Sequence, residues 1–288
     1  MPWSNRVSWI ALLLAFLAAL LFQPEYSASD VLSSHGNVLL LTAHPDDECL
    51  FFAPTIQAVT RANTPVYSLC LSIGDADGLG SVRREEFGRS LDVLGVPKDR
   101  RWVIDHPDLQ DNFTKYWDAE TIADAIYPYI LSHNISTILT FDADGISDHP
   151  NHKSLPAGAT YLLTHRSTEL PTLPRLYSLI TRSIIPKYAG ILAPIASKFS
   201  LSQERTFPVF DAHISQLYRA LQLAFTPNPN TKTHVSPQPV LVSGIPEYLT
   251  ALQAMRAHAS QLVWFRWLYV LFSRYMWVNE WVELRLDD

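Results

Sequence analysis

Residues 37–48 read NVLLLTAHPDDE, a short apolar run that passes directly into a turn of one histidine and three acids. An apolar run that ends at a polar turn is typical of a buried strand in a parallel sheet. Three carboxylates and an imidazole beside such a strand end are energetically costly unless a cation compensates them. The stretch therefore predicts an α/β fold with a metal site at the carboxyl edge of its sheet.

The alternation of strand, polar loop and helix continues along the chain. We expect further strands at residues 65–73, 101–105, 137–141, 175–180 and 240–243, and helices at 47–62, 82–94, 118–132 and 151–165. This order predicts a Rossmann-like, doubly wound and mostly parallel sheet, whose ligands bind at the carboxyl ends of the strands. Frequent prolines break residues 167–246 into short pieces.

Residues 248–278 form a long helix candidate that is rich in aromatic side chains. Two interpretations stay open. The helix either packs on the sheet, or it faces lipid with Arg266 and Arg274 at the depth of the headgroups.

A second polar stretch, FDADGISDHPNH at residues 141–152, follows another predicted strand. A catalytic zinc site uses three protein ligands and leaves a fourth position for water. His44 and Asp47, together with one histidine of the second stretch, complete such a set. Asp46 then remains as a carboxylate that can move a proton, and the other histidine can hydrogen-bond an oxyanion. The pattern predicts hydrolysis of an amide.

The composition excludes other classes of function. The 288 residues carry a net charge of -6, so no basic field exists to bind nucleic acid. Only 17% of the residues are charged, fewer than the roughly 25% of typical soluble domains, which agrees with membrane association. Cys49 and Cys70 lie in apolar runs and are interpreted as buried hydrophobic residues, because two cysteines make no disulfide framework.

The N-terminus contains an uninterrupted apolar stretch at residues 7–22, VSWIALLLAFLAALLF. As a helix it would rise ~24 Å, somewhat less than the ~30 Å hydrocarbon core of a bilayer. A cleaved signal peptide is the alternative, but no clear cleavage site follows directly. We therefore expect a transmembrane anchor with its linker at residues 1–30 and a catalytic domain at 31–288. Arg6 and the acids after the stretch would place that domain in the lumen.

Four separated motifs carry a family resemblance. They are AHPDDE at 43–48, SVRREEFGRSLDVLGVP at 81–97, HPNH at 149–152, and MRAHASQ at 255–261 followed by WFRWLYVLFSRYMWVN at 264–279. In this order they resemble the N-acetylglucosaminyl deacetylase superfamily, and within it the eukaryotic N-acetylglucosaminyl-phosphatidylinositol (GlcNAc-PI) de-N-acetylases. The resemblance spans about residues 37–279. One departure is Asp148, where the family often has glycine.

The resemblance implies roles for individual residues. His44, Asp47 and His152 look like ligands of Zn²⁺, although another divalent cation tolerates the same set. Asp46 looks like the general base and His149 like the oxyanion partner.

It also implies substrate contacts. Arg83, in an arginine-x-x-glutamate motif with Glu86, resembles a phosphate or sugar contact; a solvated arginine at a helix start is the alternative. Asp108 is a candidate for binding sugar hydroxyls. His258 is a candidate for approaching the substrate, against the alternative of a capped or core histidine.

The implied reaction is zinc-dependent hydrolysis of the N-acetyl group of GlcNAc-PI to glucosaminyl-phosphatidylinositol and acetate, the second step of glycosylphosphatidylinositol (GPI) anchor synthesis. The family further implies a single-pass protein of the endoplasmic reticulum membrane with its catalytic domain in the cytosol, which outweighs the single-arginine indication above. Two alternatives stay open: a deacetylase of a soluble GlcNAc conjugate with a signal peptide, and a non-catalytic subunit that binds a sugar lipid. No particular protein partner is indicated.

Overall fold

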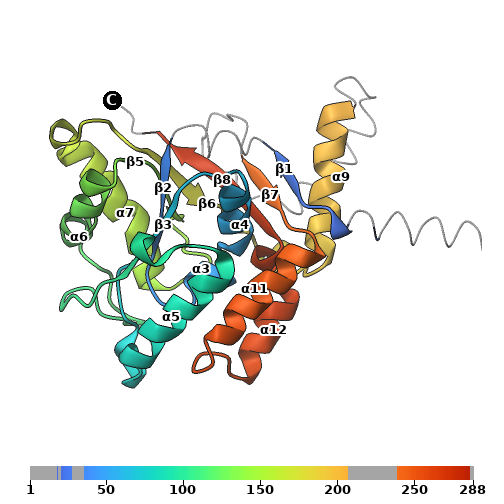
Figure 1. Cartoon of the computed structure of the whole chain (residues 1–288), viewed down its shortest axis with the longest axis horizontal. Helices are drawn as coiled ribbons and strands as arrows, with labels where there is room; N and C mark the ends of the chain where they lie inside the picture. The colour runs from blue at the N-terminus through green and yellow to red at the C-terminus, as the bar shows by residue number, and fades with distance from the viewer. Residues whose placement is uncertain (1–17, 19–20, 28–35, 207–238, 286–288) are drawn as a thin grey trace, which may run out of the picture.

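The structure is a computed structural model, and it describes residues 18, 21–27, 36–206 and 239–285. Within these residues one eight-stranded sheet has the order β1-β7-β8-β6-β5-β2-β3-β4 (Figure 1). The strands are β1 (Glu25–Ser27), β2 (Asn37–Thr42), β3 (Val66–Cys70), β4 (Arg101–Val103), β5 (Ile135–Phe141), β6 (Arg175–Leu179), β7 (Val240–Val242) and β8 (Val278–Leu284).

Helices alternate with the strands. They are α3 (Asp47–Leu50), α4 (Ala53–Arg61), α5 (Gly80–Leu94), α6 (Ala119–Ser132), α7 (Pro150–His165), α8 (Ile184–Lys187), α9 (Leu192–Thr206), α11 (Ile245–Ala257) and α12 (Trp264–Phe272). Figure 1 shows α6 and α7 on one side of the sheet and α4, α5 and α11 on the other. The predicted α/β architecture is therefore confirmed.

The sheet is parallel from β4 through β3, β2 and β5 to β6, whereas β8, β7 and β1 extend it antiparallel. After β2 the chain builds β3 and β4 on one side, then crosses back to place β5 and β6 on the other. The order thus reverses between β2 and β5. Ligands of doubly wound sheets bind at this switch point, beyond the carboxyl ends of the two strands.

The core is built on the central strands. In β2 the residues from Val38 to Leu41 are at most 1% exposed, as expected for a strand covered on both faces. Cys49 and Cys70 are both buried and unpaired, which confirms their interpretation as hydrophobic residues.

The helix predicted at 47–62 is interrupted. It is divided into α3 and α4, which are separated by the two residues Phe51 and Phe52. Pro54 lies in the first turn of α4, and it has no N–H to donate to the carbonyl of Leu50. Helix α3 therefore ends at Leu50, next to the polar turn that follows β2.

The prediction of a single helix at residues 248–278 is wrong. The segment forms α11, a break, α12, and the start of the unpredicted strand β8. Within the break, His258 bonds the buried carboxylate of Glu48, and Ser260 donates from its backbone N–H and its hydroxyl to Glu86. These tertiary contacts override the local preference for helix.

Within the part of the chain that the structure describes, no helix has the length and apolar character needed to cross a bilayer. The segment predicted to do so, residues 7–22, lies largely outside the described residues. The N-terminal transmembrane helix and the division at residue 30 stay predictions.

Candidate active site

Two loops meet at the switch point of the sheet. Strands β2 and β5 pair directly, with Leu40 opposite Leu139, so the turns that follow them lie at the same edge. Ring nitrogens of His44, from the first turn, and of His149 and His152, from the second, lie within 4.8 Å of one another. The structure therefore brings together the two motifs that the sequence separates by about a hundred residues.

Three donor atoms converge at this edge. His152 Nε2 lies 3.3 Å from His44 Nδ1 and 3.2 Å from Asp47 Oδ1. Ligands placed ~2.0–2.1 Å from a tetrahedral zinc ion are separated from one another by about 3.3–3.4 Å. Both separations from His152 Nε2 therefore match those between ligands of one shared divalent ion.

The hydrogen bonds around Asn151 assign the tautomer of His44. The Asn151 amide nitrogen donates to the carbonyl of Lys115 at 3.0 Å, and its Oδ1 accepts the backbone N–H of Asn112 at 3.1 Å. Its Oδ1 also lies 3.0 Å from His44 Nε2. Because that oxygen only accepts, Nε2 of His44 carries the hydrogen, and Nδ1 presents a lone pair to the site.

The other two donors are oriented in the same manner. His152 Nδ1 faces the backbone carbonyl of Gly145 at 3.1 Å, so its hydrogen lies there and Nε2 keeps its lone pair. Asp47 Oδ2 accepts the backbone N–H groups of Ala43 and His44 at 3.0 and 2.9 Å, which leaves Oδ1 to the site. Such outer partners are characteristic of metal ligands.

The electrostatics agree with a cation site. Burial lowers the pKa of His44 to about 4, so this ligand is neutral near pH 7. Although burial opposes both effects, the contact between His152 and Asp47 raises the pKa of the imidazole and holds the pKa of the carboxyl below its usual range. Three convergent lone pairs repel unless a cation lies between them. A proton on His152 or a divalent ion meets this need, and the donor spacing fits the ion.

Asp46 is adjacent to Asp47 in the chain, and one of its carboxylate oxygens accepts no hydrogen bond from the described residues. The backbone φ of Asp46 is 124°, a strained value that is held by a bond from its N–H to Glu48 Oε2 at 3.0 Å. Its Oδ2 is buried and accepts no hydrogen bond from the described residues, while Arg266 Nη2 lies 3.3 Å away. Burial raises the pKa of Asp46, against the opposing charges of Arg266 and Arg83. A carboxylate whose pKa is raised, and whose Oδ2 accepts no hydrogen bond from the described residues, is equipped to accept a proton.

His149 presents a donor to the site. Its Nδ1 accepts the backbone N–H of Asn151 at 3.2 Å and thereby caps α7, so the hydrogen of the neutral ring is on Nε2. The preceding Asp148 has a φ of 65°, a left-handed conformation that glycine adopts without strain.

Arg83 is buried rather than solvated, with 6% of its surface exposed. It donates to the carbonyls of Gly74 and Pro45 at 2.8 and 3.0 Å. A Cβ on Gly74 would lie 2.4 Å from the guanidinium carbon, so the close approach needs glycine there. Glu86 does not pair with Arg83, and instead accepts from Ser260. Arg83 therefore connects the loop at residues 74–80, GDADGLG, to the AHPDDE turn.

Asp111 is a site residue that the sequence analysis missed. Its Oδ1 lies 3.2 Å from His44 Nε2 and 3.6 Å from His149 Nε2, and its Oδ2 accepts from Arg83 at 3.2 Å. Although burial opposes it, these neighbours lower the pKa of Asp111 to about 2. Asp108, which the sequence analysis selected, has a 69% exposed side chain 3.9 Å from His106 Nδ1. We therefore assign Asp111, not Asp108, to the site.

The prediction that His258 contacts substrate is wrong. Its side chain is fully buried, and Nε2 lies 2.6 Å from Glu48 Oε1, which also accepts from Ser90 at 2.5 Å. Glu48 in turn holds the backbone of Asp46. His258 thus supports the turn from behind, as the core-histidine alternative stated.

Solved structures define the class of fold. The chain resembles N,N'-diacetylchitobiose deacetylase from Pyrococcus horikoshii, with a TM-score of 0.51 and 15% identity over 90% of this chain and 87% of that one. It also resembles a deacetylase from teicoplanin biosynthesis, with a TM-score of 0.52 and 13% identity over 86% and 98%. The fold is that of these deacetylases.

Sequence relatives define the family. A family model described as PIG-L, GlcNAc-PI de-N-acetylase, matches residues 39–162. The N-acetylglucosaminyl-phosphatidylinositol de-N-acetylase of Bos taurus is 32% identical over 85% of this chain and 82% of its own length. That of Saccharomyces cerevisiae is 33% identical over 84% and 79%. The chain belongs to the GlcNAc-PI de-N-acetylase family.

Proposed function

We propose that the protein hydrolyses the N-acetyl group of GlcNAc-PI, giving glucosaminyl-phosphatidylinositol and acetate, the step of GPI anchor synthesis for which its relatives are named. One observation carries the proposal: His152 Nε2 lies 3.3 Å from His44 Nδ1 and 3.2 Å from an oxygen of Asp47, and the adjacent residue, Asp46, has a buried carboxylate oxygen that accepts no hydrogen bond from the described residues. A binding module has no use for a proton acceptor next to an open metal position.

His44, Asp47 and His152 would hold Zn²⁺ or another divalent cation, since two imidazoles and a carboxylate suit several such ions. When bound, the ion lowers the pKa of a water molecule and polarises the amide carbonyl.

Asp46 accepts the proton of the attacking water and passes it to the leaving amine, a role that its raised pKa favours. His149 donates its Nε2 hydrogen to the oxyanion, an interaction worth about 3 kcal/mol of the barrier. Asp111, 3.6 Å from that nitrogen, favours the tautomer of His149 that carries the hydrogen on Nε2. Arg83 maintains the position of both loops through its bonds to Gly74 and Pro45.

The proposed location is the membrane of the endoplasmic reticulum, with residues 7–22 as a single anchor and the catalytic domain in the cytosol. The apolar stretch and the lipid in the relatives' names support this location. A deacetylase of a soluble GlcNAc conjugate is the alternative, and the N-terminal sequence of the mature protein discriminates between the two.

Release of labelled acetate from GlcNAc-PI by the purified full chain tests the proposal. Chelation should stop the reaction, and Asp46→Asn and His152→Ala should each abolish most of the turnover. Asp108→Asn is the matched control, because its carboxylate is exposed. Turnover that survives Asp46→Asn or His152→Ala unchanged contradicts the mechanism, and tight binding of the glycolipid without any acetate release indicates a non-catalytic subunit.

A further inference from the structure

Helix α12 presents an apolar surface to solvent. Val270 is the one residue of the helix that is buried, whereas Trp264 is 76% and Leu271 is 57% exposed. The other exposed apolar residues of this helix are Phe265, Trp267, Leu268 and Phe272. A helix that only packed on the sheet would bury an apolar stripe and expose polar residues, so α12 is built for a second apolar environment.

The segment from α8 to the start of α9 continues this surface. Ile184 and Ile185 are 75% and 74% exposed, and Tyr188, Ile191 and Leu192 follow them. The two segments are joined, because the N–H of Gly190 donates to the carbonyl of Phe272 at 2.8 Å. We call the exposed apolar residues of α12 together with residues 184–192 the α8–α12 face.

The α8–α12 face carries few charges. Residues 184–192 and 264–272 contain two charged residues, Lys187 and Arg266, and Arg266 pairs with the buried Asp46. The neighbouring Arg182 and Arg274 both pair with Glu280. A surface of exposed aromatic and aliphatic side chains that includes two tryptophans and so few charges complements the interface of a phospholipid bilayer.

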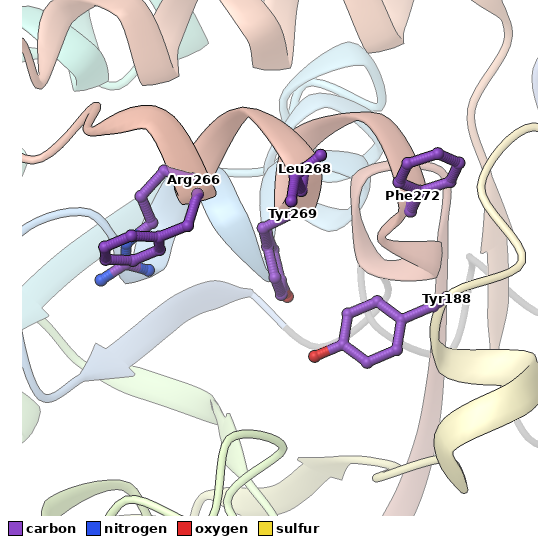
Figure 2. A pocket seen from close by; sticks show the side chains of 6 residues that line it. Tyr188, Arg266, Leu268, Tyr269 and Phe272 are labelled. Atoms are coloured by element: carbon purple, nitrogen blue, oxygen red, sulfur yellow. The ribbon is translucent and has the colours of Figure 1, made fainter.

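The face is continuous with the candidate active site. A groove of about 400 Å³ lies between α12 and Tyr188, lined also by Phe265, Arg266, Leu268, Tyr269 and Phe272. Figure 2 shows Arg266, Tyr269 and Phe272 extending from α12, with Tyr188 on the facing segment. Arg266 reaches Asp46 Oδ2 at 3.3 Å. A lipid held against α12 is thus one side chain away from the proposed general base.

We propose that the α8–α12 face docks on the surface of a phospholipid bilayer, with the tryptophans of α12 at headgroup depth and the groove opening toward the emerging sugar. The inference rests on the proposed function, because it explains how a glycolipid reaches Asp46 without leaving its membrane. It assigns bilayer contact to the catalytic domain itself, independently of residues 7–22.

Spin labels on the full chain test the docking. Both native cysteines are fully buried, so a label on Trp264→Cys or Leu271→Cys reports from one position. Leu131→Cys on α6, 41% exposed, is the control. On phosphatidylcholine vesicles that contain phosphatidylinositol, the α12 labels should be relaxed more by oxygen than by a water-soluble nickel chelate, and the control should show the reverse.

Two outcomes of this experiment overturn the proposal. Labels on α12 that stay accessible to the nickel chelate while the protein is bound to vesicles mean that the face is in water. Labels shielded from both reagents mean that protein covers it, either a second copy or another segment of this chain.

Kinetics separate this inference from the proposed function. The triple variant Trp264→Gln, Trp267→Gln, Leu271→Gln lies outside the groove lining and should lose about tenfold in kcat/KM on vesicle-borne GlcNAc-PI. On a water-soluble headgroup analogue without acyl chains it should match the wild type. Equal rates for variant and wild type on vesicles overturn the inference alone. A wild type inactive on both substrates overturns the proposed function, while the spin labels still test the face.

Discussion

Asp111→Asn is the most informative substitution, because it keeps the shape of the side chain and removes only its charge. Asp111 contacts two histidines and Arg83, and these contacts lower its pKa to about 2, from an ordinary value of 3.8. A lowering of this size corresponds to about 2 kcal/mol of favourable interaction with the charged form. The variant loses this energy in a site that is otherwise unchanged.

Part of the loss falls on the metal, since outer partners of ligating histidines alter metal affinity by about 10–100-fold. We therefore expect the dissociation constant for Zn²⁺ of Asp111→Asn to rise by about that factor, measured by competition with a chromophoric chelator. Acetate release at saturating metal should still fall, because His149 loses its carboxylate neighbour. Asp108→Asn is the control and should behave as wild type. Wild-type metal affinity and wild-type turnover in Asp111→Asn would refute this account of the site.

Two further predictions concern stability. His258→Ala removes the imidazole that pairs with the buried carboxylate of Glu48, so chemical denaturation should show a loss of about 3–5 kcal/mol of unfolding free energy; a loss below about 1 kcal/mol contradicts the supporting role. Glu280 pairs with Arg182 at 2.8 Å and Arg274 at 3.0 Å, and although burial raises its pKa, the two arginines lower it to about 2. Because the native state favours the charged form, this stabilisation of about 3 kcal/mol is complete above the unfolded pKa near 4.5 and is lost as the pH falls toward about 2. Glu280→Gln should be less stable at neutral pH and lose less between pH ~4.5 and ~2, and parallel pH profiles for the two proteins contradict the assignment.

The sequence predicts the parallel part of the sheet and the meeting of the two polar motifs because both depend on local signals. The apolar run of β2 ends where the acids begin, and β5 ends before the second motif, so pairing of these strands brings His44 and His152 together. Two local motifs that are distant in the sequence thus form one site because the strands that precede them pair.

The failures have a common physical cause, which is tertiary contact without a local pattern. Asp111 lies in an irregular loop after β4, and no spacing distinguishes it from the exposed Asp108. The buried contact of His258 with Glu48 joins residues 210 positions apart, and it also ends α11 where the aromatic pattern suggested a continuous helix.

The central claim is that His44, Asp47 and His152 share one divalent ion. Elemental analysis combined with X-ray absorption at the metal edge, on the purified full chain and on His152→Ala, tests it most directly. We predict about one ion per chain with two imidazoles in its first coordination shell at ~2.0–2.1 Å, and its loss from the variant. A fully active protein without stoichiometric metal, or an ion that the variant retains with unchanged coordination, would contradict the account.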